Sequence, residues 1–222
     1  MPGSHANVRV KICGLSTPET VKAAVEAGAD YLGFVFYERS PRNVSPELAG
    51  ELAALVPASV LKVALTVDAD DAALERIIGA LDPDILQLHG EETPERLREI
   101  KGRFGVTLMK VIAVSGPEDL DRIAVYRDCA DLLLFDAKAP KSMPGALPGG
   151  NGLIFDWSLI AGRKPDIPWM LSGGLTAENV GEAIRMTGAE AVDVSSGVEE
   201  APGRKSPKLI GRFIQAAKTS GR

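Results

Sequence analysis

Two side chains that can exchange protons stand at the ends of short hydrophobic runs typical of buried strands. Cys13 ends the run Val8–Cys13, and Asp136 ends the run Leu132–Asp136. Thiol and carboxyl groups both serve as general acids and bases in enzymes. Each residue alone is also common in a structural role, the cysteine as an inert buried thiol and the aspartate as a helix cap. The pair becomes a candidate for proton transfer only if the fold brings the two strand ends together.

Two glycine-containing turns offer a site for an anion. Ser172-Gly173-Gly174 comes at the end of the run Trp169–Ser172, and Ser195-Ser196-Gly197 at the end of Ala191–Ser195. Glycine lets the backbone approach a ligand closely, and a helix that follows adds positive potential at its N-terminus. Either turn alone would serve equally well as a tight connection between a strand and a helix. Because both occur, they predict a phosphate site that includes Gly173, Gly174, Ser196 and Gly197.

Two more polar side chains follow strand-like runs. Arg42 comes after the run Tyr31–Phe36, and His89 ends the run Ile85–His89. In isolation, such an arginine is more often a solvated surface residue, and such a histidine can simply satisfy hydrogen bonds at the end of a strand. We therefore give His89 only a supporting role in a site.

These residues need a fold that gathers the ends of strands. Strand-like runs alternate with amphipathic, helix-like segments, which predicts a parallel sheet covered by helices. The runs are Val8–Cys13, Tyr31–Phe36, Val60–Val67, Ile85–His89, Leu108–Val114, Leu132–Asp136, Trp169–Ser172 and Ala191–Ser195. Both βα barrels and open α/β sheets place active sites at the carboxyl ends of their strands. We expect an α/β fold, a single (β/α)8 TIM barrel, with an open doubly wound sheet as the alternative.

The alternation of side chains along strands predicts a buried ion pair. If Cys13 faces the barrel interior, so does Lys11, and Asp193 faces inward on the eighth strand. The first and eighth strands are neighbours in a closed barrel, and an unpaired buried charge would be costly. We therefore expect Lys11 to support the site by pairing with a carboxylate, most plausibly that of Asp193, which is itself a candidate substrate-binding residue.

The connection Ala137–Phe155 is rich in proline and glycine and has little apolar periodicity. Loops longer than about 12 residues without their own secondary structure are uncommon in compact domains, and many of them are lids. We expect this connection to be partly disordered or mobile without a ligand and to order over a bound substrate.

Composition excludes several functions. The 222 residues include 25 basic and 30 acidic side chains, with no basic run that could follow a nucleic-acid backbone. No apolar run approaches the roughly 20 residues of a membrane span, and no secretory signal is evident, which favours a cytoplasmic protein. Cys13 and Cys129 show no zinc-site spacing, so we expect neither a metal nor a disulfide, and a packing role for Cys129. Residues 7–222 are expected to form one catalytic domain, after a flexible lead-in or cloning remnant at residues 1–6.

The candidate residues stand in an ordered series of motifs. These are Lys11-Ile12-Cys13-Gly14, Gly33-Phe34-Val35-Phe36, Ser40-Pro41-Arg42, Gln87-Leu88-His89-Gly90, Leu134-Phe135-Asp136, Gly149-Gly150-Asn151-Gly152, Leu171-Ser172-Gly173-Gly174 and Asp193-Val194-Ser195-Ser196-Gly197-Val198-Glu199. In order and spacing the series resembles the phosphoribosylanthranilate isomerase family, over nearly the whole chain after Ala6.

The resemblance implies a cofactor-independent isomerase of tryptophan biosynthesis. Its reaction is the Amadori rearrangement of N-(5'-phosphoribosyl)anthranilate to 1-(2-carboxyphenylamino)-1-deoxyribulose 5-phosphate. From the sequence itself we expect either a monomer or a homodimer, because the outer face of a barrel can be sealed by its helices or used for dimerisation. The resemblance implies that Asp136 is the acid that opens the sugar ring and that Cys13 is the base that removes the proton from C2. It also implies that Arg42 binds the anthranilate carboxylate, a planar anion that suits a guanidinium fork.

Two other functions are alternatives. Other phosphosugar barrels, such as indole-glycerol-phosphate synthase and the pentose-phosphate epimerases, share the phosphate glycines but use different catalytic residues. A barrel that binds a phosphometabolite without catalysis is the second alternative. The presence of both Cys13 and Asp136 favours the isomerase over either of them.

Overall fold

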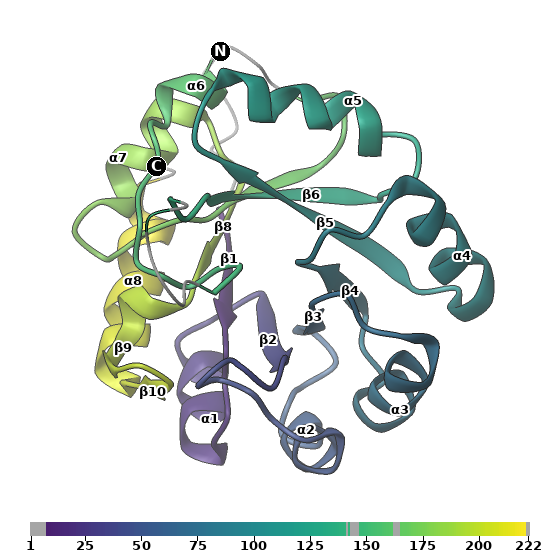
Figure 1. Cartoon of the computed structure of the whole chain (residues 1–222). Coiled ribbons are helices and arrows are strands. Elements are labelled where there is room, and N and C mark those ends of the chain that lie inside the picture. The colour runs from purple at the N-terminus through teal and green to yellow at the C-terminus, as the bar shows by residue number, and fades with distance from the viewer. Residues whose placement is uncertain (1–7, 141, 143–146, 162–164, 221–222) are drawn as a thin grey trace.

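Eight parallel strands form a closed barrel, in which each strand pairs with the next and β8 pairs with β1 (Figure 1). The computed structural model describes residues 8–140, 142, 147–161 and 165–220. The expected lead-in, residues 1–6, lies outside the described residues. The strands are β1 (Arg9–Cys13), β2 (Tyr31–Phe36), β3 (Leu61–Thr66), β4 (Ile85–Leu88), β5 (Thr107–Val114), β6 (Leu132–Ala137), β7 (Trp169–Leu171) and β8 (Ala191–Val194).

The closed barrel confirms the expected (β/α)8 fold over the open sheet. Every strand begins and ends within one residue of the run expected from the sequence. In an open sheet the terminal strands would each expose an unpaired edge. Here β1 and β8 are paired along their length, with Lys11 in register with Asp193.

Helices surround the barrel, and their starts follow local sequence signals. The helices are α1 (Pro18–Glu26), α2 (Pro46–Ala53), α3 (Asp71–Leu81), α4 (Pro94–Phe104), η1 (Pro117–Asp121), α5 (Arg122–Tyr126), α6 (Ser158–Ala161), α7 (Val180–Thr187) and α8 (Pro207–Ser220). The side chains of Thr17 and Ser45 accept hydrogen bonds from backbone N–H groups in the first turns of α1 and α2. Proline follows each cap at a position where no N–H is needed. Among the described residues, no helix is both long and apolar enough to cross a membrane.

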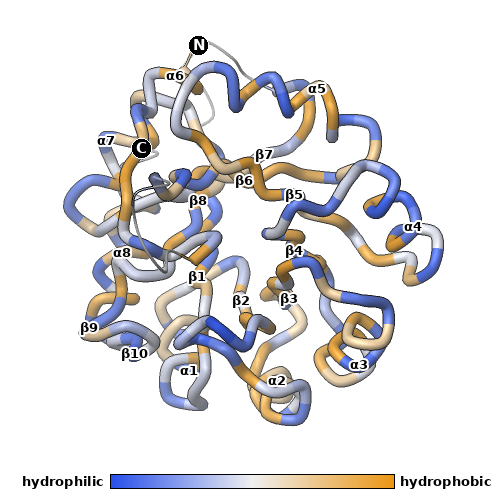
Figure 2. The backbone as a smooth tube through the Cα atoms, viewed as in Figure 1, coloured by the Kyte–Doolittle hydropathy of each residue, from blue (hydrophilic) through white to orange (hydrophobic). Residues whose placement is uncertain are grey.

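The hydrophobic core has two layers because side chains alternate along each strand. One set of side chains fills the barrel interior: Tyr31, Val63, Ile85, Met109, Val111, Leu134, Met170 and Ala191. A larger cluster fills the space between the strands and the helices. Figure 2 shows the strands as mostly hydrophobic, while the helices carry both hydrophobic and hydrophilic residues. The same alternation directs Cys13 and Asp136 into the mouth of the barrel, where both line a pocket.

A short antiparallel hairpin follows the eighth strand. After η2 (Ser196–Val198), β9 (Glu199–Ala201) pairs with β10 (Arg204–Lys205). The sequence analysis did not anticipate this hairpin, because its strands are too short and too polar to stand out. It places Glu199 beside Arg42 and Lys205 beside Ser195, at the edge of the pocket.

The connection after β5 is held by one buried carboxylate. Asp119 Oδ2 accepts hydrogen bonds from Ser115 N at 2.8 Å and from Gly116 N at 3.2 Å, and Oδ1 accepts one from Lys138 Nζ at 2.7 Å. Burial alone would raise the pKa of Asp119, but the bonds from Lys138 and from the Ser115 and Gly116 groups outweigh it and lower the pKa to about 2. The folded state therefore favours the ionised form of Asp119.

We expect Asp119→Asn to reduce the free energy of unfolding at neutral pH by about 2 kcal/mol, the value of a shift of this size. A folded-state pKa below the unfolded value stabilises the protein above about pH 4, and that contribution disappears as the pH falls toward 2. Urea unfolding of both proteins across this range measures the difference. Asp128→Asn, at an exposed carboxylate of the same region, is the control. A difference that stayed constant down to pH 2 would show that the charge of Asp119 is not its cause.

Candidate active site

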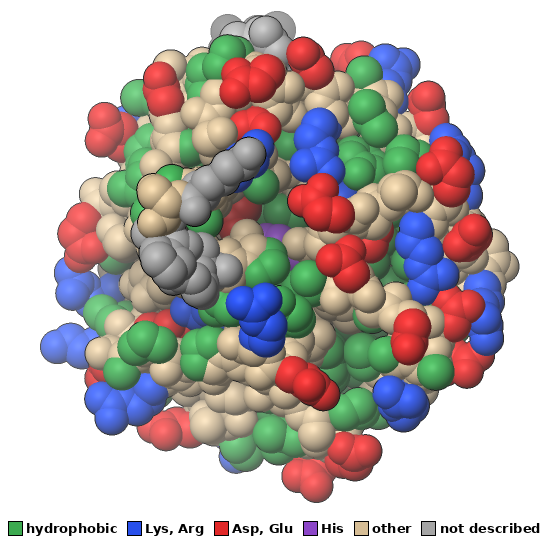
Figure 3. All heavy atoms as spheres, viewed as in Figure 1, with side chains coloured by type: hydrophobic (Ala, Val, Ile, Leu, Met, Phe, Trp, Pro, Cys, Tyr) green, Lys and Arg blue, Asp and Glu red, His purple; other side chains and the backbone are tan. Residues whose placement is uncertain are grey.

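A pocket opens at the carboxyl ends of the strands, as expected. Figure 3 shows this face, with a histidine side chain at the bottom of a central hollow. The space between its walls and its open mouth is roughly 730 Å³, a usual size for a site that binds a small molecule. The expected site residues that line it are Cys13, Arg42, His89, Asp136, Gly173, Gly174, Asp193, Ser196 and Gly197.

Lys11 lies directly beneath Cys13 and makes the expected ion pair. Its Nζ is 2.9 Å from Asp193 Oδ1, and its side chain is fully buried. Asp193 Oδ2 accepts a second hydrogen bond, from Ser172 Oγ at 3.1 Å. The predicted pairing of Lys11 with Asp193 is confirmed. Burial opposes the charge on Lys11, but Asp193 and Cys13 more than compensate, so the pKa of Lys11 is raised and the lysine stays cationic.

The thiol of Cys13 is nearly inaccessible, with 3% of the residue exposed. Burial raises the pKa of this thiol above its ordinary value, and the carboxylate of Asp193 adds to the increase. Lys11 and Lys205 favour the thiolate and lower the pKa, but by less than burial raises it. The expected help from Lys11 is therefore present, although it does not produce a low pKa. A Cβ on Gly33 would lie 3.0 Å from Cys13 Sγ, so glycine leaves the room that this contact between β1 and β2 needs.

Asp136 and His89 face each other across the pocket floor. Asp136 Oδ1 accepts a hydrogen bond from Ala137 N at 2.9 Å, and Oδ2 lies 3.5 Å from His89 Nε2. His89 Nδ1 is 3.3 Å from Gln87 Nε2. His89 Nε2 is buried and has no hydrogen-bond partner in the described part of the chain. Simple satisfaction of hydrogen bonds thus accounts for one ring nitrogen of His89 and not for the nitrogen that faces Asp136.

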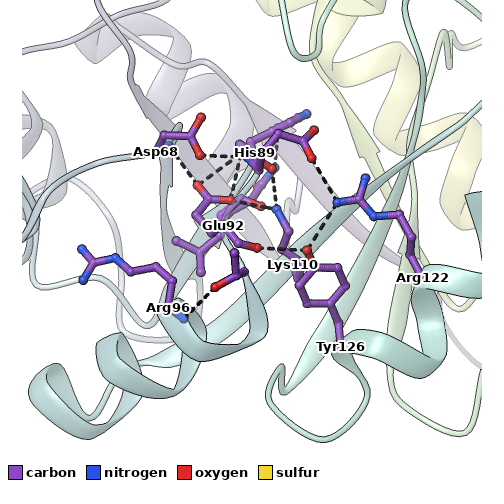
Figure 4. Close-up of polar contacts among 12 residues, drawn as sticks. Asp68, His89, Glu92, Arg96, Lys110, Arg122 and Tyr126 are labelled. Carbon is purple, nitrogen blue, oxygen red and sulfur yellow. Dashed lines mark hydrogen bonds and ion pairs between the residues drawn. The ribbon is translucent and has the colours of Figure 1, made fainter.

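A buried polar network outside the barrel fixes the turn that carries His89 (Figure 4). Lys110 on β5 is fully buried, and its Nζ donates to the carbonyl oxygens of Leu88 at 3.2 Å and Gly90 at 2.6 Å. Its Nζ also lies 2.8 Å from the carboxylate of Glu92. The network therefore fixes the backbone of Leu88 and Gly90, the residues on both sides of His89. Lys110 and Glu92 are not among the residues predicted from the sequence, although a lysine inside the hydrophobic run Leu108–Val114 is a signal.

Arg42 is buried at the rim of the pocket and already engages a carboxylate. Its Nε and Nη2 donate to the two carboxylate oxygens of Glu199, at 2.7 Å and 2.9 Å. Nη2 also donates to the carbonyl oxygen of Gly150 at 3.2 Å. Lys205 Nζ lies 2.6 Å from Glu199 Oε1 and donates to the Ser195 carbonyl oxygen at 3.0 Å. This role of Glu199 and Lys205 is not predictable from the sequence, because it depends on the hairpin of β9 and β10.

Charge pairing keeps Glu199 ionised despite its burial. Desolvation would raise the pKa of Glu199, but Arg42 and Lys205 outweigh it and lower the pKa. Burial lowers the pKa of Lys205, and Glu199 opposes that change. The three side chains form one compact group of two cations and one anion.

The two glycine turns lie together at the opposite side of the pocket from His89's strand, after β7 and β8. Gly173 and Gly174 have φ values of 89° and 61°, which favour glycine. A Cβ on Gly197 would overlap the carbonyl oxygen of Leu175, and one on Gly174 would lie 2.7 Å from that of Leu153. Close packing within the protein therefore accounts for these glycines, as it would in simple tight turns. Their place on the pocket wall is what makes them available to an anion.

Part of the connection that was expected to be a lid lies against the catalytic candidates. Residues 141 and 143–146 of this connection are outside the described residues. A Cβ on Gly149 would lie 2.5 Å from His89 Cε1 and 2.6 Å from Asp136 Oδ2, so this backbone passes directly over both side chains. The residues from Leu147 to Leu153 all line the pocket.

Comparisons with known proteins agree on one family. Residues 10–216 match the family model described as N-(5'phosphoribosyl)anthranilate (PRA) isomerase. The chain is 73% identical to the N-(5'-phosphoribosyl)anthranilate isomerase of Parvibaculum lavamentivorans, over 96% of this chain and 99% of that protein.

Solved structures give the same result. The phosphoribosyl anthranilate isomerase of Thermotoga maritima is similar, with a TM-score of 0.85 and 39% identity over 96% of this chain and 99% of that one. A structure of phosphoribosyl anthranilate isomerase in complex with reduced 1-(o-carboxyphenylamino)-1-deoxyribulose 5-phosphate has a TM-score of 0.83 and 38% identity, over 96% of this chain and 99% of that one. This chain belongs to the N-(5'-phosphoribosyl)anthranilate isomerase family.

Proposed function

We propose that this chain isomerises N-(5'-phosphoribosyl)anthranilate by the Amadori rearrangement, in tryptophan biosynthesis, with Asp136 as acid and Cys13 as base. The observation that carries the proposal is one pocket lined by a thiol, a carboxyl group, Arg42 and the two glycine turns. We place the reaction in the cytoplasm, in a monomer or a homodimer, and in one catalytic domain over residues 7–222.

The acid step begins at the ring oxygen of the sugar. Asp136 gives its proton to this oxygen, the bond from the oxygen to C1 breaks, and an iminium ion forms between C1 and the anthranilate nitrogen. Asp136 suits this step because Ala137 N anchors Oδ1, while Oδ2 lies beside two pocket-lining residues, His89 and Gly149. A carboxyl group held in one rotamer needs little rearrangement to reach the substrate.

The base step follows at C2. The thiolate of Cys13 takes the proton from C2, the electron pair neutralises the iminium ion, and the resulting enolamine rearranges to the ketone of the product. Lys11 supports this step because its cation lies against Cys13 and stays charged through Asp193. The thiolate therefore forms next to a fixed positive charge in a buried site, where such an interaction is strong.

The two anionic ends of the substrate need separate donors in the pocket. We assign the carboxylate of the anthranilate to Arg42, whose guanidinium is a cationic hydrogen-bond donor on the pocket wall. We assign the phosphate to Gly173, Gly174, Ser196 and Gly197, which follow the seventh and eighth strands. Many barrels of this fold hold a phosphate at that place. His89 and Asp193 support substrate binding indirectly. His89 lies beside Asp136, and Asp193 holds Lys11 and Ser172 in place.

Exchange of either catalytic group should stop turnover without preventing binding. We expect Cys13→Ser and Asp136→Asn each to lower kcat by roughly 10²–10⁴-fold, the usual contribution of general acid or base catalysis. Loss of substrate fluorescence measures turnover, and calorimetry measures affinity for the reduced product, which should change far less. Cys129→Ser is the matched control, because this second buried thiol packs in the hydrophobic cluster outside the pocket and donates a hydrogen bond to Tyr126 O. Near-normal turnover by either variant would remove that residue from the mechanism. Tight binding without any turnover by the unaltered chain would favour a non-catalytic barrel.

Lys11 should set the pH at which the enzyme becomes active. Because burial raises the pKa of Cys13, kcat/KM should increase with pH as the thiol ionises. Lys11→Met removes a charge that favours the thiolate, so the acid limb of this profile should move to higher pH. Lys11→Met with Asp193→Asn should move it less, because Asp193 itself raises the pKa of Cys13, and this pair avoids an unpaired buried carboxylate. An unchanged acid limb in both variants would show that the group that titrates is not Cys13.

The connection between β6 and α6 should close over the ligand. The backbone at Gly149 already lies over Asp136 and His89, where it would exclude water from a reactive open-chain intermediate. We expect amide hydrogen exchange of residues 147–155 to slow when the reduced product binds. Equal exchange rates with and without that ligand would contradict the lid.

A further inference from the structure

The carboxylate-binding end of the pocket contains a carboxylate of its own. Glu199 takes two donor atoms of Arg42, Nε and Nη2, in a bidentate pair. A substrate carboxylate would have to displace Glu199 or use the remaining atom, Nη1. In the first case Glu199 competes with the ligand for Arg42 and weakens binding. In the second case Glu199 orients Arg42 for the ligand and strengthens binding.

Burial and a second cation argue that Glu199 stays in place. Only 4% of its side chain is exposed, and Lys205, which is 1% exposed, lies 2.6 Å from Oε1. Removal of the carboxylate from this position would leave two buried cations without their shared anion. Breaking such a group is strongly unfavourable, whereas a ligand that binds beside it leaves the ion pairs intact and avoids this energetic cost.

Nη1 is the guanidinium nitrogen of Arg42 that these bonds leave without an acceptor among the described residues, on a side chain that lines the pocket. Gly150 lies close to this nitrogen, since a Cβ there would be 2.6 Å from Nη1. Gly150 has a φ of 73°, which favours glycine. On the other side, a Cβ on Gly14 would lie 2.7 Å from Arg42 Cδ. Two glycines thus give the side chain its room, while Glu199 fixes its direction.

We propose that Glu199 is the positioning residue of the carboxylate end: it holds Arg42 by Nε and Nη2, with Lys205 as its anchor, so that Nη1 is presented to the carboxylate of the substrate. The proposal deepens the proposed function and rests on its assignment of Arg42. A guanidinium that is already oriented loses little side-chain freedom when the ligand binds, which raises affinity. Lys205 also donates to Ser195 O at 3.0 Å, so the same group touches the turn assigned to the phosphate.

The first test is the affinity of Glu199→Gln for the reduced product. This variant keeps the shape of the side chain but can accept only one of the two bonds from Arg42 and no longer balances Lys205. We expect affinity to fall on the order of tenfold and KM to rise with it, while kcat changes little. Glu200→Gln is the matched control, since this neighbouring carboxylate is exposed and pairs with Arg204 on the surface. Affinity equal to that of the unaltered chain would overturn the proposal, and tighter binding would in addition make Glu199 a competitor of the ligand.

The second test asks whether Glu199 acts through Arg42. In a double-mutant cycle with Arg42→Ala, Glu199→Gln should weaken binding much less than it does when Arg42 is present. A loss of the same size in both backgrounds would contradict a positioning role and indicate a general structural one. Glu199→Asp keeps the charge and should recover part of the affinity, which covers the case in which Glu199→Gln folds poorly.

These measurements use binding of the reduced product and do not require turnover. If the unaltered chain binds this ligand and the cycle behaves as expected, the positioning role stands even where the proposed isomerisation fails. If turnover is normal and the cycle is additive, the isomerisation stands and the positioning role fails.

Discussion

The ion pair between Lys11 and Asp193 joins β1 to β8, and both the closed barrel and its site depend on this pairing of strands. The two residues are in register where β1 and β8 close the barrel, and their charged groups are 2.9 Å apart. A shift of one residue in this register would turn every side chain of one strand to the other face. It would place Lys11 among the aliphatic side chains under the helices, where an unpaired charge is very costly. The pair therefore favours the register that brings Cys13 into the mouth.

Three groups of buried ion pairs among the described residues each hold a different part of the pocket. Lys11 with Asp193 lies under Cys13, Lys110 with Glu92 holds the turn of His89, and Glu199 joins Arg42 to Lys205. Buried ion pairs add little net stability compared with apolar packing, but the loss of one partner is expensive. Their value here is geometric, because the first fixes the register of β1 and β8 and the other two fix turns that follow strands. The group of Arg42, Glu199 and Lys205, with two cations and one anion, also supplies local positive charge to an anionic ligand on a chain whose net charge is −5.

The sequence was sufficient where a regular period decides the structure. Eight β-rich runs between amphipathic segments gave every strand within one residue, and the period of two along β1 predicted the partner of Lys11. It was insufficient where contacts depend on irregular turns. The bond between Glu199 and Arg42 spans two loops and needs a hairpin of short polar strands, so no period marks it. The pKa of Cys13 was equally out of reach, because it is a balance between burial and three neighbouring charges.

That balance has a consequence for the role proposed for Cys13 as a base. Burial makes the thiolate of Cys13 scarce at neutral pH, but a thiol with a raised pKa binds a proton more strongly once it is ionised. Lys11 and Lys205 limit the scarcity by favouring the thiolate, and they are held in place by Asp193 and Glu199 respectively. A bound ligand with a phosphate and a carboxylate adds negative charge to the same pocket and acts against the thiolate. The fixed cations near Cys13 are therefore needed most when the substrate is present. Each of them is paired with a carboxylate of the protein, which keeps it from pairing with the ligand instead.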